Sequence, residues 1–136
     1  MSIDLAQRLL DAADNDELMA RSLLPVEGVT DAGIGFHAQQ AIEKSIKAIL
    51  ALQGIEFPFT HDLDRLSELC AESGVAPPPT LDGAQRLTPF AAAERYGSPI
   101  PIELDRDQAL RWAAAAVEWA RQQIESASDG DTTNPQ

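Results

Sequence analysis

Residues 31–53 place apolar side chains at intervals of three and four, the spacing that puts them on one side of an α-helix. The stacked positions are Ile34, Ala38, Ala41, Ile42, Ser45, Ala48, Ile49 and Leu52, and Ile46 and Leu50 widen the arc. A helix with so wide an apolar arc must be covered by neighbours on more than one side. Gly54 can end it with a left-handed cap. The segment therefore predicts the central helix of a helical bundle.

Helical spacing recurs along most of the chain, whereas alternating β-branched runs bounded by hairpin turns are missing. Further helices are predicted over about residues 4–24, from a cap at Thr60 to Gly74, from a cap at Thr80 with a restart at Thr88–Pro89, and from Asp105 to about Ser126. The proline run at 77–79 interrupts the helical pattern and reads as a stiff connector. We therefore expect an all-α fold.

The length of 136 residues corresponds to one ordinary domain. We predict a single helical domain over residues 1–127, followed by an acidic and polar tail over residues 128–136. The tail has no apolar stripe to bury, so it is expected to be disordered. The first residues lack a signal-peptide pattern, and no stretch approaches the ~20 apolar residues of a membrane span. A cytoplasmic location without membrane contact is expected.

The net charge of −12 and the pI near 4.3 argue against general affinity for nucleic-acid backbones. On this acidic background His37, Gln40, Lys44 and Lys47 lie three, four and three residues apart and form one line beside the apolar stripe, called here the polar ridge. The ridge holds both lysines of the chain, which suggests a site for a phosphate or for a carboxylate of a partner. The alternative is a helix edge whose lysines pair with neighbouring acidic residues, among them Asp16, which interrupts the apolar stripe of the first helix.

Other kinds of site are not supported by the spacing of reactive residues. His37, His61 and Cys70 are not spaced as zinc ligands, and Cys70 lies on an apolar helical face, as a buried structural thiol does. No glycine-rich phosphate loop follows a strand, because no strand is predicted. We expect no catalytic set, no metal site and no cofactor.

A longer string of residues resembles the HEPN domain family. It comprises Phe36 to Leu50 (FHAQQAIEKSIKAIL), His61-Asp62-Leu63, Leu87-Thr88-Pro89-Phe90 and Arg95-Tyr96. The resemblance runs from the first predicted helix to the last. It implies an antiparallel bundle of four or five helices, frequent homodimers, nucleotide binding, and pairing with a minimal nucleotidyltransferase in two-component toxin–antitoxin modules.

Many HEPN proteins are metal-independent ribonucleases that use an arginine followed four to six residues later by a histidine. This sequence lacks that motif, since the nearest such pair, Arg21 and His37, is sixteen residues apart. We therefore expect a non-catalytic interaction module that forms a homodimer and pairs with a minimal nucleotidyltransferase. The alternatives are a nucleotide-binding protein and a ribonuclease toxin with an atypical active site. The candidate nucleotide- or partner-binding residues are His37, Gln40, Lys44, Lys47, Arg95 and Tyr96.

Overall fold

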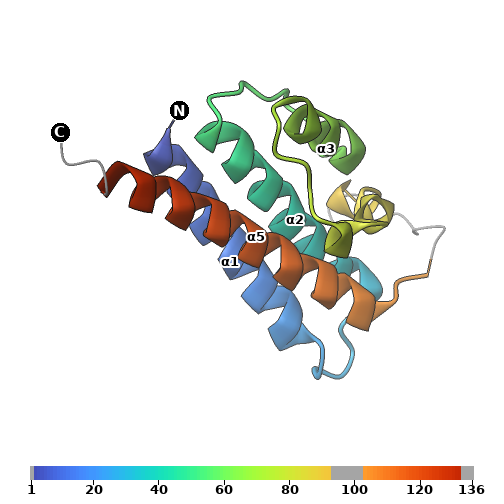
Figure 1. The fold of residues 1–136 in the computed structure, drawn as a ribbon. Helices are drawn as coiled ribbons and strands as arrows, with labels where there is room; N and C mark the ends of the chain where they lie inside the picture. The colour runs from blue at the N-terminus through green and yellow to red at the C-terminus, as the bar shows by residue number, and fades with distance from the viewer. Residues whose placement is uncertain (1, 93–102, 133–136) are drawn as a thin grey trace.

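Three long helices form the body of the structure, a computed structural model that describes residues 2–92 and 103–132 (Figure 1). They are α1 (Ile3–Leu23), α2 (Asp31–Leu52) and α5 (Arg106–Thr132). In Figure 1, α1 runs in the direction opposite to α2 and α5, and the three helices contact one another pairwise. The described residues contain helices and turns but no strand. The all-α fold and the antiparallel bundle predicted from the sequence are confirmed.

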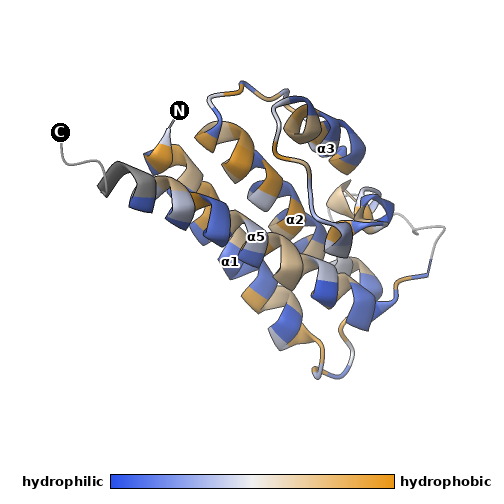
Figure 2. Cartoon of the chain, in the orientation of Figure 1, coloured by the Kyte–Doolittle hydropathy of each residue, from blue (hydrophilic) through white to orange (hydrophobic). Residues whose placement is uncertain are grey.

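The remaining elements cover the part of α2 that α1 and α5 leave open. They are α3 (Leu63–Glu72) and two short 3-10 helices, η1 (Pro79–Leu81) and η2 (Ala84–Leu87). Fifteen of the 22 residues of α2 are buried, and Figure 2 shows hydrophobic residues along this helix and hydrophilic ones on the outer sides of its neighbours. The prediction that α2 is the central helix is thus confirmed.

The start of α3 differs from the sequence-based prediction. The cap is Asp62, whose Oδ1 accepts a hydrogen bond from the N–H of Asp64 at 3.0 Å, whereas Thr60 was predicted. Thr60 instead closes the turn before it, since its Oγ1 accepts from the N–H of Asp62 at 3.1 Å. Thr88, predicted to cap a helix of its own, accepts from the N–H of Leu63 at 3.2 Å and so satisfies a free donor in the first turn of α3.

The prediction of one helix that begins at Thr80 is also wrong. Residues 79–87 form η1 and η2 with a break between them, at which Gly83 adopts a φ of 91°. A left-handed residue cannot lie inside an α-helix, so the chain turns there and restarts. The cap at Asp105 is confirmed, because its Oδ1 accepts from the N–H of Gln108 at 3.0 Å.

The end of α5 lies beyond the predicted one. The helix continues to Thr132, whereas the sequence predicted an end near Ser126 and a disordered tail from residue 128. Residues 133–136 lie outside the described residues. Among the side chains of α5 that the structure describes, which end at Asp129, Ile124 is the last buried one and Ala127 the last apolar one that touches the core.

We expect that deleting residues 128–136 changes the melting temperature by no more than about 2 °C, because the sequence of the deleted segment has no apolar stripe. Thermal unfolding of the full and shortened chains, followed by circular dichroism, measures this. A loss of several degrees would mean that the last turns of α5 stabilise the bundle.

Candidate functional site

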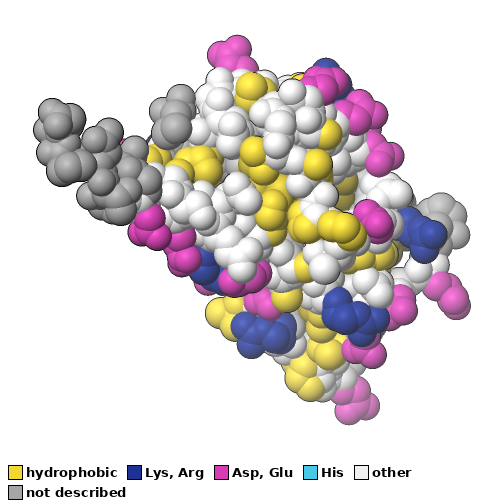
Figure 3. All heavy atoms as spheres, viewed as in Figure 1, with side chains coloured by type: hydrophobic (Ala, Val, Ile, Leu, Met, Phe, Trp, Pro, Cys, Tyr) yellow, Lys and Arg dark blue, Asp and Glu magenta, His cyan; other side chains and the backbone are white. Residues whose placement is uncertain are grey.

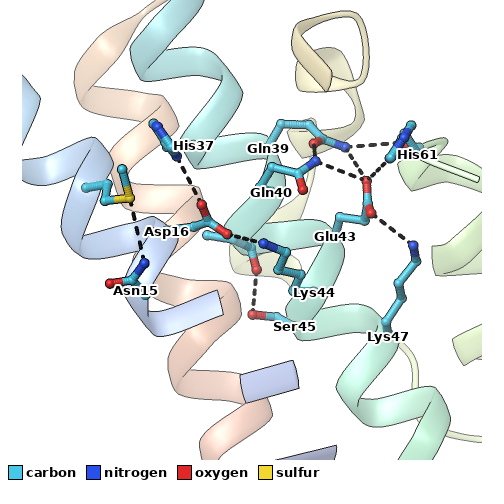
Figure 4. A network of polar contacts seen from close by, with 12 residues as sticks. Asn15, Asp16, His37, Gln39, Gln40, Glu43, Lys44, Ser45, Lys47 and His61 are labelled. Atoms are coloured by element: carbon cyan, nitrogen blue, oxygen red, sulfur yellow. Dashed lines mark hydrogen bonds and ion pairs between the residues drawn. The ribbon is translucent and has the colours of Figure 1, made fainter. Parts of the chain in front are cut away.

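Two buried carboxylates organise the polar ridge (Figure 4). Asp16 comes from α1 and is 6% exposed, and Glu43 comes from α2 and is 3% exposed. Each carboxylate contacts one lysine and one histidine. Because removing a carboxylate from water is costly, such groups are stable in a protein interior only when they are paired and hydrogen-bonded. The ridge cations supply that pairing.

The Asp16 carboxylate joins α1 to α2. Lys44 Nζ donates to Asp16 Oδ2 at 2.6 Å, and His37 Nδ1 lies 3.0 Å from Asp16 Oδ1. His37 also makes an edge-to-face contact with the ring of Phe36, with centroids 5.1 Å apart. The acidic residue that interrupts the apolar stripe of α1 is therefore a partner for two ridge residues on the neighbouring helix.

The Glu43 carboxylate joins α2 to the loop that precedes α3. Lys47 Nζ donates to Glu43 Oε2 at 2.9 Å, and His61 Nδ1 lies 2.7 Å from Glu43 Oε1. Lys47 Nζ also lies 5.6 Å from the ring centroid of Phe57, which is close enough for a cation–π contact. These contacts hold residues 53–62 against the side of α2.

Two glutamine side chains complete the network around Glu43. Gln39 Nε2 donates to Glu43 Oε1 and to the carbonyl oxygen of His61, both at 3.1 Å. Gln40 Nε2 donates to Gln39 Oε1 at 2.7 Å. Among the described residues, no buried side-chain nitrogen or oxygen lacks a hydrogen-bond partner. The buried polar atoms around the two carboxylates therefore all find their partners within the protein.

The pairing decides what the ridge offers to a ligand. Lys44 and Lys47 each neutralise a buried carboxylate, so the two cations and two anions of the network compensate one another. A phosphate at the ridge would have to take a lysine away from its carboxylate. These contacts match the alternative interpretation of the sequence, in which the ridge lysines pair with acidic residues of the same chain.

The structure brings together four of the six candidate residues and adds partners that the candidate list lacked. His37 and Lys44 lie around Asp16, and Gln40 and Lys47 lie around Glu43, while Arg95 and Tyr96 are outside the described residues. The added partners are Asp16, Gln39, Glu43 and His61. Signals for two of them were present, because Asp16 interrupts the apolar stripe of α1 and the i, i+4 spacing of Glu43 and Lys47 favours a pair on one helix.

Cys70 is fully buried, as the sequence predicted. Burial raises the pKa of its thiol to about 12. At neutral pH the thiol is therefore protonated, and the thiolate, which is the nucleophilic form, is scarce. The described part of the chain also holds no group of three residues able to bind a metal ion.

We expect Cys70 in the folded protein to react far more slowly with a chromogenic disulfide reagent at neutral pH than glutathione does. In denaturant, which removes the burial that raises the thiol pKa, it should react at the rate of an ordinary thiol. Absorbance recorded with and without urea measures both rates. Fast labelling of the folded chain would contradict the burial of this side chain.

Comparison with known proteins gives one match. The family model described as HEPN domain matches residues 6–123. No curated protein and no solved structure matches the chain. Within the described residues, no helix has both the length and the apolar character required to cross a membrane. Because the matched segment covers most of the 136 residues, the chain belongs to the HEPN domain family.

Proposed function

We propose that this HEPN domain is a non-catalytic interaction module of the cytoplasm, which forms a homodimer and pairs with a minimal nucleotidyltransferase in a toxin–antitoxin-like system. The observation that carries the proposal is that the charged side chains of the polar network are paired with one another. Its lysines and histidines are paired with its carboxylates, so these groups stabilise the fold. The fold then serves as a scaffold for protein contacts.

Ribonuclease chemistry finds little support in this network. Metal-independent RNA cleavage requires a base, an acid and a cation that stabilises charge on the phosphate. His37 and His61 are of the right type for proton transfer, but neither is preceded by an arginine at the family spacing. The nearby cations, Lys44 and Lys47, are already bonded to carboxylates.

Nucleotide binding is the second candidate, because the family resemblance includes it. A nucleotide phosphate at the ridge would compete with Asp16 and Glu43 for the same two lysines. The exchange would leave a buried carboxylate without its cation, which is energetically costly. This candidate therefore ranks below the interaction module.

Exposed apolar side chains support a role in protein contacts. Leu18, Met19 and Val26 lie near the turn between α1 and α2, and each is at least 40% exposed. Phe59, in the loop before α3, is fully exposed. Large apolar side chains left in water on ordered elements are typical of surfaces that a partner covers.

The proposal is tested with the purified chain and the product of the neighbouring open reading frame. Sedimentation at micromolar concentration should give the mass of a dimer, and calorimetry should detect binding to a minimal nucleotidyltransferase but not to free nucleotides. RNA incubated with the chain and a chelator should remain intact. RNA cleavage by the wild type that is lost in His61→Ala would show that the protein is a ribonuclease. A monomeric chain that does not bind the nucleotidyltransferase would refute the proposal.

A further inference from the structure

A groove with an apolar floor lies between α3 and the segment of residues 77–85. It has a volume of about 540 Å³. Ala71 of α3 and the prolines Pro77 and Pro78 supply its accessible apolar floor. Ile42, Ile46 and Leu81 lie beneath that floor and are 1%, 1% and 7% exposed. The two prolines also form part of one wall. Because each proline ring fixes its own φ, and Pro78 is extended with a φ of −71° and a ψ of 159°, this wall is stiff.

The rim of the groove is acidic. Asp64 and Glu68 of α3 line one side, and Asp82 lines the other. No lysine, arginine or histidine is among the residues that line this groove. On the face seen in Figure 3, acidic side chains follow the outer edge of α3, with apolar side chains gathered beside them.

The rim carboxylates differ from those of the polar network because few cations lie close enough to neutralise their charge. Asp64 and Asp82 have no ion-pair partner in the part of the chain that the structure describes, and Glu68 has a long contact of 3.5 Å to the exposed Arg65. Asp16 and Glu43, in contrast, each hold a lysine within 3 Å. Uncompensated carboxylates around an apolar floor create a negative potential that attracts cations.

The combination of floor and rim specifies the chemistry of an occupant. A lysine or arginine has an aliphatic stem that can lie on an apolar surface and a cation that can reach a rim carboxylate. Aliphatic neighbours of such a residue would pack on Ala71, Pro77 and Pro78. A second copy of this chain fits poorly, since it carries a net charge of −12 and would bring further negative charge to the acidic rim.

We propose that this groove binds a segment of a different protein that presents lysine or arginine beside aliphatic side chains. The inference deepens the proposed function and rests on it, because it names the surface of the interaction module that meets a heterologous partner. The homodimer contact then lies elsewhere on the molecule.

The probe for the test is a fluorescein-labelled amphipathic peptide that carries leucines on one side and lysines on the other. Fluorescence anisotropy should show binding that weakens at high salt, and binding should be lost when the lysines of the peptide are replaced by glutamates or its leucines by serines. In an NMR titration, the shifted amide signals should be those of α3 and of residues 77–85.

Matched variants separate the groove from the general negative charge of the chain. Asp64→Asn with Asp82→Asn should weaken peptide binding by about tenfold or more, since both uncompensated rim charges are gone. Asp11→Asn with Glu27→Gln removes the same charge from α1 and the turn after it, and should change binding by less than about twofold. Ser67→Trp should block the groove without a charge change, whereas Ser22→Trp, exposed on α1, should not.

The outcomes distinguish the groove from the pairing with a nucleotidyltransferase. Peptide binding that depends on Asp64, Asp82 and Ser67 supports the groove even if no nucleotidyltransferase binds, in which case only the proposed pairing fails. Equal binding by the rim variants and their α1 controls, or no binding by the wild-type chain, overturns the groove. A nucleotidyltransferase that binds the rim variants and Ser67→Trp as well as the wild type also overturns it and leaves the pairing intact. Circular dichroism melts of every variant confirm that each is folded.

Discussion

Lys44→Glu should lower the free energy of unfolding by about 3 kcal/mol or more. Lys44 Nζ donates to the buried Asp16 Oδ2 at 2.6 Å, and the substitution removes this cation and brings a second negative charge to the same side of α2. Among the described residues, His37, on the other oxygen of Asp16, is then the remaining ion-pair partner of this carboxylate. Since Asp16 is 6% exposed, water can offset little of the repulsion.

Urea unfolding of the variant measures this loss, and Arg111→Glu is the matched control. Arg111 lies exposed on α5 and donates to Gln108, so reversing its charge makes the same change in net charge without touching a buried group. The control should change the free energy of unfolding by less than about 0.5 kcal/mol. If Lys44→Glu were equally mild and also abolished binding to a nucleotide or a partner, the polar ridge would be a surface binding site instead of a structural link.

Gly35→Ala should destabilise the fold by about 1 to 3 kcal/mol, although alanine favours a helix over glycine by about 1 kcal/mol. The reason is the ring of Phe90, which lies directly over α2 at this position. A Cβ on Gly35 would come within 2.3 Å of Phe90 Cδ1 and 2.7 Å of two further ring atoms. Phe90 is 1% exposed, so a shift of the ring away from α2 would disturb the core contacts that bury it.

Phe90→Leu provides the control for this contact. The single substitution removes ring atoms from the core and is itself destabilising. In combination with Gly35→Ala, however, it relieves the clash, so the double variant should lose less stability than the sum of the two single ones. Additive losses in chemical denaturation, or a Gly35→Ala protein as stable as the wild type, would show that Phe90 does not restrict this position.

The fold followed from the sequence because helix formation and burial depend on spacing along the chain. The arc of α2, the cap at Asp105 and the left-handed Gly54, with its φ of 73°, are all set by neighbours within a few residues. Predictions from local spacing were wrong where a structural feature depends on residues far away along the chain. Thr88 caps α3 across 25 residues, which no local pattern could indicate, and Gly83 divides a segment whose apolar residues fit a helix.

The candidate site shows the same division between local and distant effects. Spacing alone placed His37, Gln40, Lys44 and Lys47 on one line of α2, and the structure has them there. Whether those cations are free or compensated depends on Asp16, 28 residues from Lys44, and on the position of His61, 18 residues from Glu43. An ion pair is decided by distance in space and by access to water, and both are set when α1 and the loop before α3 pack against α2. The sequence therefore determined the helices and the line of polar residues. The tertiary structure alone decided that the charges of these polar residues are balanced by carboxylates of the same protein.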